Sequence, residues 1–189
     1  MQNGFFARQA VRGALFLAAT TLSCASIAQT GTPDFPKPEG ALADSLAALS
    51  DAWNTSGLAF TVAAFAEAPA AGYGQYTPRA SASFAADEPL TVYAEPVGYG
   101  FSSSDASYSY SLQASYRLLN TTGQVLASQE GFADFSGTTR SAKRELSASL
   151  SFQFSGLPAG KYTLETTFAD KIGGKSGTIS LPFTISTSQ

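Results

Sequence analysis

The chain has 189 residues, enough for one ordinary domain, with 14 Phe and 8 Tyr but few charged residues. Many aromatic and small polar residues together with few charges favour an all-β domain over a helical bundle, and they argue against disorder. The sequence has no His, which excludes Ser-His-Asp and Cys-His catalysis as well as the usual zinc, copper and haem ligand sets.

Residues 1–28 have the pattern of a cleaved signal peptide. Arg8 and Arg12 precede an apolar run over residues 13–22, and small residues at Ser26 and Ala28 predict a cut after Ala28. The run is shorter than the roughly 20 residues that span a bilayer, so we expect a periplasmic or secreted protein without a membrane span. Lipidation of Cys24, the only cysteine, is the alternative, although Thr21 stands where a lipoprotein signal usually has Leu.

Cleavage would remove two of the 11 basic residues and none of the 14 acidic ones, leaving 9 basic residues and a net charge of −5. An acidic chain lacks the basic footprint that nucleic acids and anionic membrane surfaces require. The mature chain would also have no cysteine, so its core alone must stabilise the fold.

Residues 29–40 contain three prolines and predict an extended tether before the domain. Residues 41–56 then form a predicted amphipathic helix, because Leu42, Leu46, Leu49 and Trp53 recur on one face. We expect this face to pack on the following domain or to plug one of its ends, since a lone helix of this length is marginal. A docking helix for a partner is the alternative.

From residue 57 to residue 189 the hydrophobic period changes from 3.6 to 2. Alternating strands are predicted near residues 58–64, 81–84, 90–95, 107–119, 124–129, 145–154, 161–169 and 176–185. Seven or eight antiparallel strands, each with one apolar face, predict a β-sandwich, and a closed barrel is the alternative.

Leu157-Pro158-Ala159-Gly160-Lys161-Tyr162 follows one of these strands. The segment resembles the Leu-x-Pro-Gly-x-x-Tyr corner of immunoglobulin-like and fibronectin-type domains, one residue shorter, and residues 145–185 resemble the last strands of exported bacterial modules of this kind. The resemblance implies an immunoglobulin-like sandwich in which Leu157, Gly160 and Tyr162 are structural and the Tyr hydroxyl bonds to upstream backbone. It implies no particular function.

The sequence has no phosphate-binding glycine loop and no Asp-rich calcium loop. Glu95 with Glu67, Asp87 or Glu88 is the remaining acid pair for a glycosidase, but nothing in the spacing puts two acids in one groove. We therefore expect a protein that is not an enzyme and uses no cofactor or metal.

One set of residues suits a binding surface, because aromatic rings beside an Arg and a Glu are frequent at protein interfaces and sugar platforms. Two segments flanking the strands near 81–95 supply it, and they meet if those strands form a hairpin. The simpler alternative is that the rings cover one end of the sandwich and Arg79 pairs with Glu95. The candidate residues are Tyr73, Tyr76, Arg79, Glu95, Tyr99 and Phe101. We expect an interaction or structural module of the cell envelope that binds an envelope protein, with a carbohydrate-binding module as the alternative.

Overall fold

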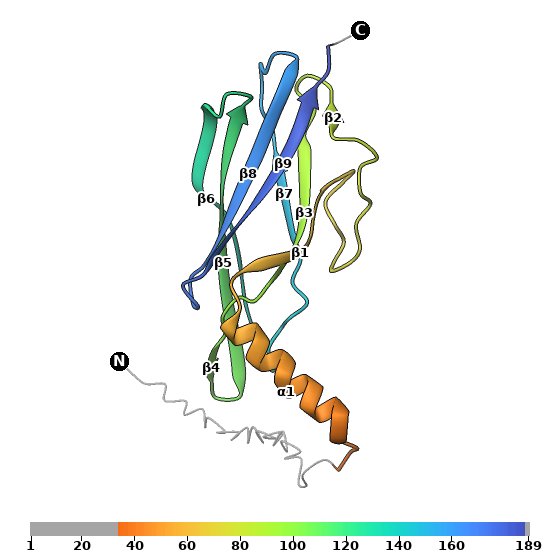
Figure 1. The fold of residues 1–189 in the computed structure, drawn as a ribbon, viewed down its shortest axis with the longest axis vertical. Coiled ribbons are helices and arrows are strands. Elements are labelled where there is room, and N and C mark those ends of the chain that lie inside the picture. The colour runs from red at the N-terminus through yellow and green to blue at the C-terminus, as the bar shows by residue number, and fades with distance from the viewer. Residues whose placement is uncertain (1–33, 188–189) are drawn as a thin grey trace, which may run out of the picture. The chain divides into compact units, whose positions relative to one another are not determined.

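The computed structural model describes residues 34–187 (Figure 1). The predicted signal peptide, Cys24 and the first part of the tether therefore lie outside the described residues. Residues 34–39 have no regular secondary structure and are exposed. The unit that begins at Pro38 contains the helix and all the described strands.

The strands form two sheets. The smaller sheet has the order β1-β3-β7 and is antiparallel throughout. The larger sheet has the order β2-β9-β8-β5-β4, with β6 also paired to β5; it is curled like half a barrel, and its β2–β9 pair is parallel. The bounds are β1 Ala59–Ala66, β2 Ser83–Phe84, β3 Leu90–Val97, β4 Ser102–Ser104, β5 Ser107–Asn120, β6 Val125–Thr139, β7 Ala148–Phe152, β8 Gly160–Asp170 and β9 Ser176–Ile185.

The core lies where the apolar faces of the two sheets meet. In β8 every second side chain is buried, as the period of a strand requires. Aromatic rings pack between the two sheets. The ring centroids of Phe65 in β1 and Phe84 in β2 are 5.1 Å apart, and those of Tyr116 in β5 and Phe152 in β7 are 5.2 Å apart. Each buried aromatic or aliphatic side chain contributes about 1.5–3 kcal/mol to the free energy of folding. Since residues 34–187 contain no cysteine, this burial stabilises the domain without disulfides.

The prediction of a mostly-β domain with one N-terminal helix is confirmed. The described residues contain nine strands instead of seven or eight, because β4 was not predicted. Strand β6 extends ten residues beyond the predicted segment, through Gly131 and Gly137, which interrupt the alternation. The Tyr110 ring lies so close to Gly137 that a Cβ there would come within 2.8 Å of its hydroxyl, so an aromatic neighbour replaces the missing side chain.

Helix α1 spans Gly40–Thr55, close to the predicted bounds. The prediction that this face packs on the domain or plugs one of its ends holds for Trp53 but is wrong for the leucines: Leu42, Leu46 and Leu49 are 59%, 43% and 48% exposed. Only Trp53 is buried, at 8% exposure. Figure 1 shows the reason, since α1 meets the strands only at its C-terminal end and runs away from them toward its N-terminus.

Candidate functional site

The structure separates the six candidate residues into three places. The condition that would have brought the two segments together, a hairpin of the strands near 81–95, is not met, because β2 pairs with β9 in the larger sheet whereas β3 pairs with β1 and β7 in the smaller one. The turn between β2 and β3, with Asp87 at φ 60°, carries the chain from one sheet to the other. Alternation along two neighbouring strands does not reveal that they belong to different sheets.

Glu95 lies on the outer face of the smaller sheet, and Tyr76 belongs to the loop that follows β1 and packs on that face. The Tyr76 ring stacks on Tyr93 with 3.9 Å between centroids. The Tyr93 hydroxyl donates to Glu95 Oε1 at 2.6 Å, and the Thr61 hydroxyl donates to Glu95 Oε2 at 3.0 Å. The backbone N–H of Gly74 donates to the Tyr93 hydroxyl at 2.7 Å. Glu95 is thus buried with both carboxylate oxygens occupied, an arrangement that fixes the loop to the sheet.

The electrostatics of this cluster oppose a role as a general base. Burial, followed by the hydrogen bond to Glu95, raises the pKa of Tyr93 to about 12. Burial and the nearby Glu95 charge also raise the pKa of Tyr73. Tyrosines with raised pKa values stay neutral near pH 7, where a general base must lose its proton. Tyr73 is 38% exposed.

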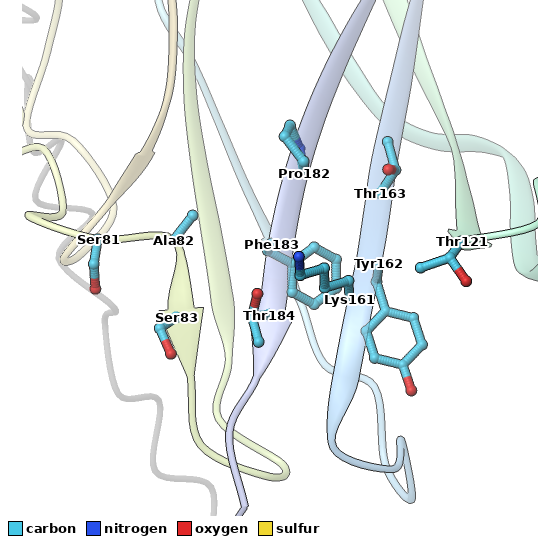
Figure 2. Close-up of a pocket in the computed structure, with 10 residues that line it drawn as sticks. All are labelled: Ser81, Ala82, Ser83, Thr121, Lys161, Tyr162, Thr163, Pro182, Phe183 and Thr184. Atoms are coloured by element: carbon cyan, nitrogen blue, oxygen red, sulfur yellow. The ribbon is translucent and has the colours of Figure 1, made fainter.

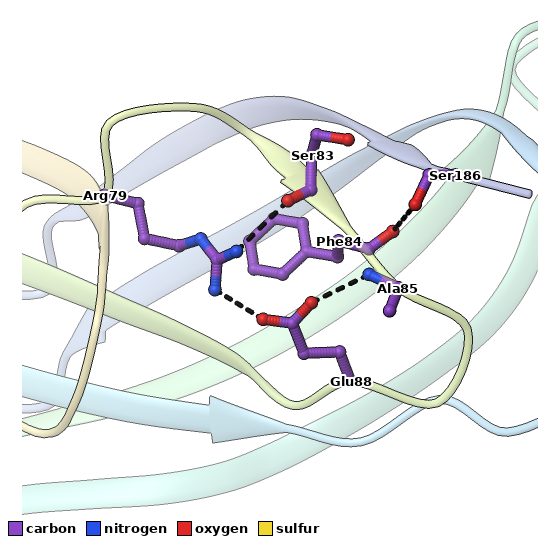
Figure 3. Close-up of polar contacts among 6 residues, drawn as sticks. All are labelled: Arg79, Ser83, Phe84, Ala85, Glu88 and Ser186. Carbon is purple, nitrogen blue, oxygen red and sulfur yellow. Dashed lines mark hydrogen bonds and ion pairs between the residues drawn. The ribbon is translucent and has the colours of Figure 1, made fainter. Parts of the chain in front are cut away.

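Arg79 belongs to a second cluster, shown in Figure 3. Its guanidinium pairs with Glu88 at 2.6 Å and donates to the backbone carbonyl of Ser83 at 3.1 Å. The guanidinium carbon lies 4.2 Å from the centre of the Phe84 ring, and Glu88 accepts the N–H of Ala85 at 2.7 Å. Pairing of Arg79 with Glu95 was therefore the wrong expectation. Arg79 holds the two residues of β2 in place.

Tyr99 and Phe101 form the third cluster, and they contact Trp53 near the C-terminal end of α1. The Trp53 ring lies edge-on to Tyr99 at 5.2 Å and stacks on Phe101 at 6.2 Å. The indole N–H donates to the Tyr99 carbonyl at 2.7 Å, and the Tyr99 hydroxyl donates to the Lys143 carbonyl at 2.5 Å. Burial raises the pKa of Tyr99. These two rings anchor the helix instead of facing a ligand.

Two cations that the sequence did not single out complete this attachment. The Lys175 ammonium donates to the carbonyls of Asn54 and Gly98 at 3.0 and 2.7 Å, so it satisfies and neutralises the C-terminal end of α1. Arg144 donates to the Ser50 hydroxyl at 2.9 Å and lies 5.7 Å above the Trp53 ring. The helix is firmly held at one end although its leucines face solvent.

The residues of the predicted corner lie where β8 begins. The Tyr162 hydroxyl donates to the Pro158 carbonyl at 2.8 Å. Leu157 is half-buried against the core, and Gly160 is the first residue of β8. All three residues have structural environments.

An open groove of about 570 Å³ crosses β2, β9 and β8 (Figure 2). Five of its ten lining residues are Ser or Thr, and Lys161 is the only charged one. The lining residues are Ser81, Ala82, Ser83, Thr121, Lys161, Tyr162, Thr163, Pro182, Phe183 and Thr184. None of the six candidate residues lines it.

Among residues 34–187, no three Asp or Glu residues come close enough together to hold a metal ion. In the same part of the chain, the helix is too short and too polar to cross a membrane. Neither a protein-family model nor a curated protein matches the sequence.

Proposed function

We propose that this chain is an exported, non-catalytic protein-interaction module of the cell envelope and that α1 is its contact element. One observation carries the proposal: three leucines at helical spacing are exposed together on α1, whereas β3, β7 and β8 bury their alternating apolar residues. Contiguous apolar surface on an otherwise well-packed domain marks an interaction site.

The proposal includes an immunoglobulin-like architecture, a scaffold that often presents binding surfaces at its ends. In that fold, strands A, B and E face strands G, F and C. The orders β1-β3-β7 and β9-β8-β5 match this arrangement in sequence order as well as in pairing. The Tyr162 hydrogen bond at the start of β8 supports it further, because the corresponding corner Tyr lies at the start of strand F.

The non-catalytic part of the proposal is supported by the chemistry of the available groups. The sequence has no His, and the buried Glu95 is fully occupied by two hydroxyl donors. Export is supported by the signal-peptide pattern over residues 1–28.

A carbohydrate platform built from loop tyrosines has less support. Sugar stacking needs exposed ring faces, yet the Tyr76 ring is stacked on Tyr93 and Tyr99 is buried. Of the three candidate tyrosines, only Tyr73 is exposed. A glycan array would revive this alternative if it showed binding that Tyr73→Ala abolishes.

The test compares the wild-type protein with a triple variant, Leu42→Ser, Leu46→Ser and Leu49→Ser, in cells that produce the protein. We expect the exported protein to begin after Ala28 by mass spectrometry and to be chemically crosslinked to an envelope protein, and we expect the triple variant to lose that product. A chain that stays in the cytoplasm, or identical products from both proteins, would refute the proposal.

A further inference from the structure

Polar side chains in the middle of the larger sheet's outer face bond one another. The hydroxyls of Thr167 in β8 and Thr178 in β9 share a hydrogen bond of 2.9 Å. Arg117 of β5 forms an ion pair with Glu165 of β8. A side chain that is occupied in this way gains little from a ligand, because binding would first break the bond that it already has.

The open groove lies on the same face, where β2, β9 and β8 run side by side (Figure 2). The strand register places Ser83 of β2 beside Thr184 of β9, and Thr184 beside Lys161 of β8. All three side chains lie on the outer face, because the residue that follows each of them along its strand is buried. Neighbouring strands are about 4.8 Å apart, so this row spans about 10 Å.

The polar groups of the groove have no partners of their own. Within residues 34–187 the ion pairs are Arg79 with Glu88 and Arg117 with Glu165, so the Lys161 ammonium is unpaired there. The five Ser and Thr hydroxyls that line the groove form no side-chain hydrogen bond in that part of the chain, and no Asp or Glu lines it. The groove therefore offers one positive charge and several hydroxyls to a ligand.

These groups together indicate the chemistry of that ligand. A hydroxyl both donates and accepts hydrogen bonds, which matches the hydroxyls of a sugar. An ammonium with no carboxylate beside it favours a negatively charged group. Pro182, which is exposed opposite Thr163, adds an apolar surface for the C–H face of a sugar ring. The groove volume of about 570 Å³ lies within the range of small-ligand sites.

We propose that this groove binds a sugar that carries a negative charge. The carboxylate, sulfate or phosphate of the sugar would accept hydrogen bonds from Lys161, and the ring hydroxyls would bond to Ser83 and Thr184. Only one charged group is recognised, so the site does not need the extended basic footprint that a polyanion requires. None of the groove residues belongs to α1, so this site does not depend on the function proposed for the helix.

The test screens the protein, purified from the cells that produce it, on an array of oligosaccharides. The array carries neutral sugars and sugars with uronic acid, sulfate or phosphate groups. We expect binding to an acidic class and not to the neutral sugars, and the class that binds identifies the charged group. Isothermal titration with the bound oligosaccharide should show about 10- to 100-fold weaker binding for Lys161→Gln and about 2- to 10-fold weaker binding for Thr184→Val.

Lys171→Gln is the matched control. Lys171 is also exposed and, within the described residues, unpaired, but it follows the opposite end of β8. The control removes the same charge and should leave binding unchanged. Melting followed by circular dichroism verifies that each variant is folded.

Several results would overturn the proposal. One is that no acidic sugar binds, and another is that neutral sugars bind equally well. Equal losses from Lys161→Gln and Lys171→Gln would mean that the charge acts without a defined site. Displacement of the sugar by an equal concentration of sodium acetate or sulfate would mean that the groove holds a simple anion and does not recognise the sugar.

Discussion

Replacing Trp53 with Ala tests how α1 is attached to the domain. The variant loses the indole of Trp53, a residue that is buried with 8% of its surface exposed. It also loses the stacking of this ring on Phe101 and its hydrogen bond to the Tyr99 carbonyl. Trp-to-Ala changes in cores cost about 3–5 kcal/mol, and the unpaired carbonyl explains about 1–3 kcal/mol of that loss. We therefore expect the free energy of unfolding to fall by about 3–5 kcal/mol.

The matched change is Leu46→Ala on the same helix. Because the Leu46 side chain contacts little and Ala is an equally good helix former, we expect a loss below about 0.5 kcal/mol. Urea unfolding followed by circular dichroism measures both variants, which avoids fluorescence because Trp53 is the only tryptophan. A loss above about 2 kcal/mol for Leu46→Ala would refute the reasoning, since it would mean that the leucine face is packed on the domain.

Three further changes test the clusters of Arg79 and Tyr93 and the turn after β8, in which the Asp170 carboxylate accepts the backbone N–H groups of Gly100, Ile172 and Gly173. Arg79→Ala should lower the free energy of unfolding by about 1–2 kcal/mol in thermal unfolding. The Ala85 N–H and Arg79 lower the pKa of Glu88, so the stability that Glu88 contributes is complete above pH 4.5 and is lost as the pH falls below that value. The Glu88→Gln variant should not show this loss. Asp170→Ala leaves three backbone N–H groups without their acceptor, and urea unfolding should show a loss of about 3–5 kcal/mol. Burial and a neighbouring carboxylate raise the pKa of Tyr93 to about 12, so stability should decline as the pH rises from 10 toward 12, with a phenolate absorbance step that Tyr93→Phe removes.

Each of these three changes has a result that contradicts its reasoning. Stability of Arg79→Ala equal to that of the wild type would show that β2 is held without the clamp. An Asp170→Ala variant as stable as the wild type would mean that the turn finds other acceptors. If Tyr93→Phe leaves the phenolate absorbance step toward pH 12 unchanged, the tyrosine with the raised pKa is not Tyr93.

The strands were predictable wherever each one buries a single face. In β5 and β8, Leu112, Leu118, Leu164 and Phe168 keep a period of 2, so local sequence identifies both strands. Which strands pair depends on long-range packing, which the period does not encode. The period therefore could not tell that β2 and β3 belong to different sheets.

The candidate site was only partly predictable for a related reason. Aromatic residues next to glycines predict loop positions, and Tyr73 and Tyr76 do lie in a loop. Their partners come from distant segments: Tyr76 stacks on Tyr93, and Tyr99 receives the indole of Trp53, which lies 46 residues earlier in the chain. No local pattern reveals that a ring will be taken up by such a contact.

Helix α1 shows what hydrophobic periodicity does and does not specify. The spacing of Leu42, Leu46 and Leu49 indicates that one face avoids water, but the pattern is the same whether the cover belongs to this chain or to another. The two cases differ in how the helix is attached to its own domain. A helix that lies on its own domain makes contacts along its length, whereas the contacts of α1 with the domain are concentrated toward its C-terminal end, at Trp53 and Ser50. Among the described residues, side chains of the strands and Trp53 at the C-terminal end of α1 fill the core, and Leu42, Leu46 and Leu49 remain outside it.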